Sequence, residues 1–140
     1  MRIAFLDTTY QFTTDTPYKS PLGGSQSALC YLAVELTRLG HAITIFNRLP
    51  GHNESDGVQI RHISEINVPG RLKSFDVVIV LNLAWATKLC QAVGFDVPLV
   101  LWTQHAHDQP SISALNHRNE RERWAGFAFV SYWQRDCYER

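Results

Sequence analysis

The chain has 140 residues, of which 45% are hydrophobic and 19% charged, a composition that excludes a disordered polypeptide. Its 13 basic and 13 acidic side chains give a net charge of zero, which disfavours binding to nucleic acid or to an acidic membrane through a basic patch. No apolar run approaches the roughly 20 residues of a transmembrane helix. We therefore expect one domain over residues 1–140 with no transmembrane segment, and a peripheral membrane contact stays open.

An apolar segment at the N-terminus predicts the first strand of a sheet. Residues 2–7 (RIAFLD) end in a carboxylate, and the polar stretch 8–21, which contains two prolines, is typical of a loop. Apolar residues between positions 28 and 39 follow the i, i+3, i+4, i+7 spacing of a helix with one buried face. We expect Ser25 to be the N-cap of this helix and Gly40 to end it.

Strand-like and helix-like segments alternate along the rest of the chain. The expected strands are 42–46, 58–63 (near the sheet edge), 76–81, 98–103 and 127–131. The expected helices are 84–93, a weakly helical stretch 111–123, and 132–140. The expected turns or loops are 50–57 and 105–110, and for 68–75 we expect a turn or a single helical turn. This alternation predicts an α/β fold with a Rossmann-like, doubly wound, mostly parallel sheet and helices on both faces.

The cysteines indicate the redox environment. Cys30, Cys90 and Cys137 are widely spaced, odd in number and form no CxxC motif. This pattern favours reduced thiols in a cytoplasmic protein over a disulfide framework. Small, buried or half-buried residues are a better interpretation of these cysteines than a catalytic nucleophile.

Two glycines stand between the first expected strand and its helix, in the sequence Leu22-Gly23-Gly24-Ser25-Gln26. Ligands of open parallel sheets sit outside the carboxyl ends of the strands, and a helix N-terminus there offers unpaired N–H groups to phosphate. We therefore expect Gly23, Gly24, Ser25 and Gln26 to bind a ligand; a tight helix entry without a ligand is the alternative. The dinucleotide fingerprint GxGxxG and the P-loop motif are both absent.

A second candidate follows the expected strand 98–103, in the sequence Thr103-Gln104-His105-Ala106-His107-Asp108. No metal site is expected, because groups this close in sequence do not easily reach one ion together and no other cluster completes a ligand set. We expect His105 and His107 to hydrogen-bond a substrate hydroxyl or phosphate. The alternative for each is a surface histidine.

Polar residues follow three other expected strands. Asp7 ends the first, Asn82 follows the strand 76–81, and Ser131 ends the last. Because the carboxyl ends of parallel strands meet at one edge of a sheet, we expect these residues to line the same edge as His105. Each is alternatively a turn residue or a helix cap.

Several of these segments make the chain resemble a known family. The Gly23-Gly24 turn, the long helix and then Leu39-Gly40-His41-Ala42-Ile43-Thr44-Ile45 are similar to the N-terminal half of a GT-B glycosyltransferase, most of all of glycosyltransferase family 4. The strand 76–81, the strand end Trp102-Thr103-Gln104-His105 and the pair Val130-Ser131 before a helix add to the resemblance. The similarity covers the whole chain.

The resemblance implies an acceptor-side domain that faces a C-terminal donor-binding domain, absent from this chain, across a cleft. It implies transfer of a hexose from a nucleotide-sugar to a hydroxyl of an acceptor small molecule or glycan, with retention and without a metal or other cofactor. His105 would lie by the transferred sugar as the catalytic residue, Gly23 and Gly24 near the donor diphosphate or the acceptor, and Ser131 on the cleft side.

The chain departs from the family pattern at two points. Gln26 stands where an acidic residue is common, and the paired-glutamate motif of the donor-binding domain is missing. The last expected helix also lacks a stop signal, so we expect the domain to continue beyond Arg140; a short frayed terminus is the alternative. The isolated chain is expected to be inactive. The competing hypothesis is a stand-alone Rossmann-like ligand-binding or interaction module without catalysis.

Overall fold

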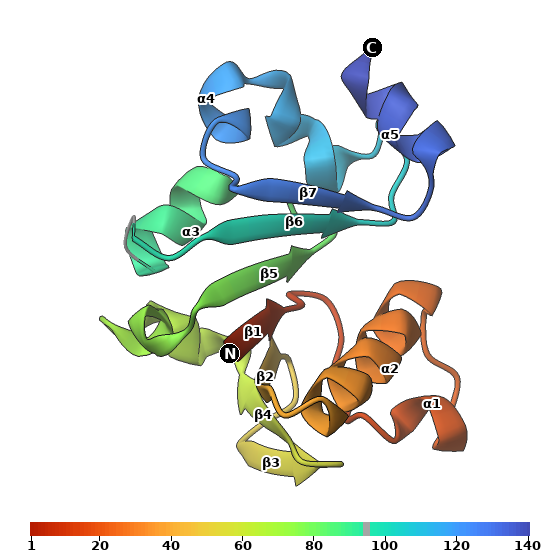
Figure 1. Cartoon of the computed structure of the whole chain (residues 1–140), viewed down its shortest axis with the longest axis vertical. Helices are drawn as coiled ribbons and strands as arrows, with labels where there is room; N and C mark the ends of the chain where they lie inside the picture. The colour runs from red at the N-terminus through yellow and green to blue at the C-terminus, as the bar shows by residue number, and fades with distance from the viewer. Residues whose placement is uncertain (94–95) are drawn as a thin grey trace.

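The computed structural model describes residues 1–93 and 96–140, which fold around one central sheet (Figure 1). The strands are β1 (Arg2–Leu6), β2 (Ala42–Asn47), β3 (His52–Ser55), β4 (Val58–His62), β5 (Val77–Leu81), β6 (Leu99–Thr103) and β7 (Gly126–Phe129). The α-helices are α1 (Thr16–Lys19), α2 (Gly24–Arg38), α3 (Ala86–Val93), α4 (Arg118–Arg121) and α5 (Tyr132–Glu139). The 3-10 helices are η1 (Ile63–Asn67), η2 (Arg71–Ser74) and η3 (Pro110–Asn116).

The strands lie in the order β3-β4-β2-β1-β5-β6-β7. Every neighbouring pair is parallel except β3 and β4, which form an antiparallel hairpin. Without β3, this is the order of a Rossmann sheet, in which the direction of winding reverses between β1 and β5. The structure confirms the predicted α/β class and the mostly parallel, Rossmann-like sheet.

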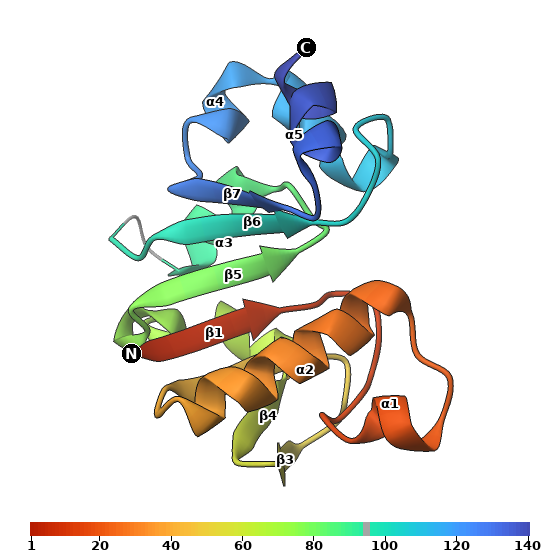
Figure 2. The ribbon, with the colours of Figure 1, turned by 45° about the vertical axis from the view of Figure 1, so that its right-hand side comes forward.

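The side chains of β1 alternate between two hydrophobic clusters. Phe5 packs in a cluster with Leu29 of α2, and its neighbour Leu6 packs in a second cluster with Leu89 of α3. Successive residues of a strand point to opposite faces of a sheet, so α2 and α3 contact β1 from opposite sides. Figure 2 shows α2 in front of the sheet and α3 behind it.

The segment 50–57 contains the strand β3, so the prediction of a polar turn is wrong for half of it. The chain reverses at Asp56 and Gly57, whose φ angles of 52° and 78° are typical of a type I′ hairpin turn. Asp-Gly is the sequence signal for this turn, but the preceding residues, HNES, are too polar to resemble a strand. These polar residues are accepted in a strand because β3 lies at the edge of the sheet and pairs on one side only.

The start of α2 also differs from the prediction. The helix begins at Gly24 with Gly23 as its N-cap, so the prediction that Ser25 caps it is wrong. Gly23 has φ −60° and ψ 150°, the extended conformation of a cap residue, whereas Ser25 is already helical. Gly40 ends the helix region as predicted, with a left-handed φ of 87°.

Two other segments contain helices that the sequence pattern did not separate. The expected loop 8–21 includes the one-turn helix α1, with Pro17 in its first turn. The weakly helical stretch 111–123 is divided into η3 and α4 at His117, which has an extended conformation. Every helix in the described residues is too short or too polar to cross a lipid bilayer.

Candidate functional site at the strand ends

The carboxyl ends of β1, β5, β6 and β7 form one edge of the sheet, which we call the rim (Figure 2). Asp7, Asn82, Gln104 and Val130 are the residues that follow these strands. The N-terminus of α2 lies at the same edge, because Gln26 in its first turn contacts Asp7. Neighbouring strands are about 5 Å apart, so about 10 Å separates the ends of β1 and β6.

The first turn of α2 has no side-chain cap. The N–H of Ser27 bonds to the carbonyl oxygen of Gly23 at 2.9 Å. In the described part of the chain, the main-chain N–H groups of Gly24, Ser25 and Gln26 have no hydrogen-bond partner. Gly24 is exposed, and no atom lies within 4 Å of the position that a Cβ would occupy there. This turn therefore combines unpaired donors with space for a ligand.

The side chain of Gln26 is buried and hydrogen-bonded within the fold. Its Nε2 donates to Asp7 Oδ2 at 2.7 Å, and the residue is only 6% exposed. Asp7, 2% exposed, also accepts from the N–H groups of Thr9 and Tyr10 through Oδ1. A Cβ at Gly23 would lie 2.5 Å from Gln26 Oε1, so glycine at this position leaves room for the Gln26 amide.

Two further helices, which follow strands that end at the rim, are capped by side chains. In α3, Glu120 accepts from the N–H of Thr87 at 2.9 Å and from its hydroxyl. In α5, Ser131 Oγ accepts from the N–H of Gln134 at 3.1 Å. Burial raises the pKa of Glu120, but the bonds from Thr87, the charge of Arg123 and the main chain of Ala86 together hold that pKa below its ordinary value. Ser131 therefore serves as a helix cap, the alternative that its sequence position left open.

Asn82 joins the ends of β5 and β6. It has a left-handed φ of 57°, and its Oδ1 accepts from the N–H of Gln104 at 2.7 Å. Within residues 1–93 and 96–140, the side-chain Nε2 of Gln104 is buried and has no hydrogen-bond partner. A buried donor without a partner is costly, so Gln104 provides a polar group that a ligand or water at the rim would satisfy.

His105 is held beside the rim through both its ring and its main chain. Ring atom Nδ1 lies 2.7 Å from Ser111 Oγ, in η3. The carbonyl oxygen of His105 accepts bonds from Gln134 and Tyr138, both in α5. The predicted site residue is therefore oriented by segments on both sides of its loop.

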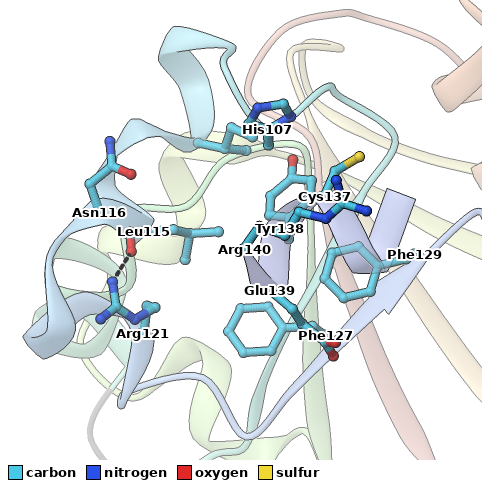
Figure 3. A pocket seen from close by; sticks show the side chains of 11 residues that line it. His107, Leu115, Asn116, Arg121, Phe127, Phe129, Cys137, Tyr138, Glu139 and Arg140 are labelled. Atoms are coloured by element: carbon cyan, nitrogen blue, oxygen red, sulfur yellow. Dashed lines mark hydrogen bonds between the residues drawn. The ribbon is translucent and has the colours of Figure 1, made fainter. Parts of the chain in front are cut away.

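His107 lies apart from His105, at a cavity of about 640 Å³ between η3, β7 and α5 (Figure 3). Its ring makes an edge contact with Tyr138, with the centroids 6.4 Å apart. Phe127 and Phe129 form an aromatic wall on the other side of the cavity. Tyr138 thus contacts both predicted histidines, but His107 lines this cavity and His105 does not.

The three cysteines form no disulfide with one another in the described residues. Cys30 and Cys90 are buried, and Cys137 is half-buried. Burial raises the pKa of Cys30 to about 12 and also raises that of Cys90. Neither of these two thiols is a nucleophile at neutral pH.

Sequence reasoning missed Ser111, Gln134 and Tyr138 as partners of His105. The spacing Ser131-x-x-Gln134 is that of a capping box, and this signal could have drawn attention to Gln134. In the folded chain, however, the Gln134 Oε1 accepts from Val130 instead of from the cap residue. The local sequence gives no signal for Ser111 or Tyr138, because both contacts depend on the tertiary fold.

In the described part of the chain, no group of three or more His, Cys, Asp or Glu side chains could hold a metal ion. A scan against protein-family models finds no match for this chain. Comparisons with curated proteins and with solved structures find no match either.

Proposed function

We propose that this chain is the acceptor-side domain of a GT-B glycosyltransferase similar to family 4, which moves a hexose from a nucleotide-sugar to an acceptor hydroxyl with retention. The observation that carries the proposal is the first turn of α2, which has no side-chain cap and begins where the winding of the sheet reverses. Ligands of parallel α/β sheets bind at such points, and unpaired helix N–H groups favour phosphate oxygens.

In this proposal the α2 end of the rim binds phosphate through its main chain. The N–H groups of Gly24 and Ser25 donate to phosphate oxygens, and the open space beside Gly24 supports a close approach. Gln26 does not contact the ligand, because its buried amide is bonded to Asp7. Gln26 instead holds the first turn of α2 against the end of β1.

In this proposal the ring of His105 binds the transferred sugar. Its Nε2 hydrogen-bonds a sugar hydroxyl, about 10 Å along the rim from the end of β1, a span that a sugar joined to a diphosphate can bridge. The transfer breaks the bond between sugar C1 and the donor phosphate oxygen and forms a bond from C1 to the acceptor oxygen. The acceptor proton passes to the leaving phosphate, whose charge the α2 N–H groups stabilise.

The proposal assigns the opposite wall of the cleft to a donor-binding domain, whose paired-glutamate motif the 140 residues lack. The isolated chain is therefore expected to bind nucleotide-sugars weakly and to transfer no sugar. Neither a metal nor another cofactor is required in this scheme.

Calorimetric titration of the chain with UDP-glucose and with GDP-mannose tests the proposal. We expect one of them to bind, and the variant Gly24→Ala to weaken its binding about fivefold, because the added methyl group fills the space beside the phosphate. Glu35→Gln, an exposed substitution in the last turns of the same helix, is the control and should leave the affinity unchanged. Sugar transfer by the isolated chain, or binding of neither nucleotide-sugar, would contradict the proposal and favour the module without catalysis.

A further inference from the structure

A ring of hydrogen bonds holds the main chain of His105. Its carbonyl oxygen accepts from Tyr138 Oη at 2.8 Å, and its N–H donates to Thr103 Oγ1 at 3.2 Å. The two hydroxyl oxygens are themselves 3.2 Å apart. Tyr138 gives its only hydroxyl hydrogen to His105, so the hydrogen between the two hydroxyls comes from Thr103. Each of the three residues thus donates once and accepts once, which fixes the direction of every bond.

The surroundings keep this ring intact at neutral pH. Thr103 is fully buried. Burial raises the pKa of Tyr138, and the opposing effect of its bond with Thr103 is smaller. The Tyr138 hydroxyl therefore remains protonated and continues to donate. Hydrogen bonds that follow one another in a low-dielectric interior also strengthen one another.

Gln134 makes a second bond to the same carbonyl oxygen. Its Nε2 donates to His105 at 2.9 Å, and its Oε1 accepts from the N–H of Val130 at 2.8 Å. The residue is only 5% exposed. Because both ends of its amide are engaged, Gln134 ties the His105 loop to the end of β7 and to the first turn of α5.

The ring of His105 is held at one nitrogen. Nδ1 is paired with Ser111 Oγ, and the carbonyl oxygen of Ser111 accepts from the N–H of Ala84 at 3.1 Å. In the part of the chain that the structure describes, Nε2 has no hydrogen-bond partner. Nε2 is consequently the ring nitrogen that is left for a ligand.

We propose that Tyr138 and Gln134 are positioning residues, which fix the main chain of His105 so that its Nε2 meets the transferred sugar, and that Ser111 fixes the ring. This inference rests on the proposed glycosyltransferase function. It makes α5 a part of the sugar-binding apparatus through side chains that do not themselves contact the sugar.

NMR of the whole chain with ¹⁵N-labelled histidine tests the positioning directly. Tyr138→Phe removes only the hydroxyl and should change the His105 ring signals and speed exchange of the His105 amide about tenfold. Tyr132→Phe, at an exposed position of the same helix, is the matched control and should change neither. Ser111→Ala should alter the ratio of the two ring tautomers, and Ser111→Thr, which keeps the hydroxyl, should restore it.

Titration with UDP-glucose and with GDP-mannose separates this inference from the proposed function. We expect the nucleotide-sugar that binds to shift the His105 ring signals, and Tyr138→Phe to raise its Kd about threefold without changing the shift of the Gly24 amide at saturation. Identical His105 spectra and Kd values for Tyr138→Phe and Tyr132→Phe would overturn the positioning role and leave the proposed function standing. If neither nucleotide-sugar shifts Gly24 or His105 in the unmodified chain, the proposed function fails and the positioning role fails with it.

Discussion

The helices α2 and α3 both follow strands that end at the rim, but their first turns are satisfied in different ways. In α3, the carboxylate of Glu120 bonds to Thr87. In α2, the cap residue is Gly23, and no side chain accepts a bond from the main-chain N–H groups of the first turn. The partial positive charge at a helix N-terminus favours an anion. The protein supplies that anion to α3 from its own chain, whereas the first turn of α2 has no such cap and, in the proposed function, offers the same field to a ligand.

The carboxylate nearest to α2 is Asp7, and it does not serve as a cap. It bonds to the side chain of Gln26 and to the N–H groups of Thr9 and Tyr10. An acidic residue at position 26 would place a second carboxylate against Asp7, where two like charges cannot both ionise cheaply. The neutral amide of Gln26 thus fits beside Asp7. The polar side chains of Asp7 and Gln26 support the fold here, and the proposed function uses only the main-chain N–H groups of the first turn of α2.

The largest expected effect comes from removing the Asp7 carboxylate, which joins the end of β1 to the first turn of α2. Asp7→Ala should lower the free energy of unfolding by about 3 kcal/mol, because it leaves the buried amide of Gln26 and the part-buried N–H groups of Thr9 and Tyr10 without their acceptor. Urea denaturation measures this change. Asp108→Ala, at an exposed carboxylate in the loop after β6, should stay within about 0.5 kcal/mol of the unmodified chain. Equal losses in the two variants would show that Asp7 does not anchor the first turn of α2.

The next largest change in stability is expected at Gly23, and a comparison with Gly24 isolates the role of Gln26. Gly23→Ala should cost about 1–2 kcal/mol, because the new Cβ displaces Gln26 Oε1 and breaks its buried bond to Asp7. Gly24→Ala meets no atom within 4 Å and should change stability by less than about 0.5 kcal/mol. In a Gln26→Ala background the cost of Gly23→Ala should disappear. A cost that persists there would mean that Gly23 is required for its backbone conformation instead.

The smallest effect concerns the cap of α3 and depends on pH. Glu120→Gln should lower stability by about 1 kcal/mol at pH 7, since the charged cap is lost. The pKa of Glu120 is held below its ordinary value of 4.5, so its contribution is complete above that pH and disappears as the pH falls through the folded-state pKa. Unfolding of the two chains at a series of pH values should therefore converge in acid.

Glu122→Gln is the control for the cap of α3. Glu122 pairs with Arg118 at the surface, in an exposed ion pair that should contribute little. The same pH dependence for Glu120→Gln and Glu122→Gln would refute the capping role.

The framework of the fold and the position of the site could be predicted from local sequence. Apolar runs such as Val77–Leu81 identify buried strands, and the ends of parallel strands locate the rim. The polar strand β3 was not predictable, because its pairing with β4 and its edge position, not its composition, stabilise it.

The hydrogen bonds that distinguish the helix N-termini could not be predicted from the sequence either. Glu120 and Thr87 are 33 residues apart, and His105 and Gln134 are 29 apart. No periodicity links such residues, because their meeting depends on how α4 and α5 pack against the sheet. The sequence therefore predicted His105 as a candidate without indicating what holds it.

The most direct test of the central claim compares the two helix N-termini in one NMR titration. UDP-glucose and GDP-mannose are added separately to the ¹⁵N-labelled chain, and the amide signals of Gly24 in α2 and Thr87 in α3 are followed together. The account predicts that one nucleotide-sugar shifts Gly24 in a saturable way and leaves Thr87, already bonded to Glu120, unchanged. A shift of Thr87 equal to that of Gly24, or no shift of Gly24 with either compound, would contradict it.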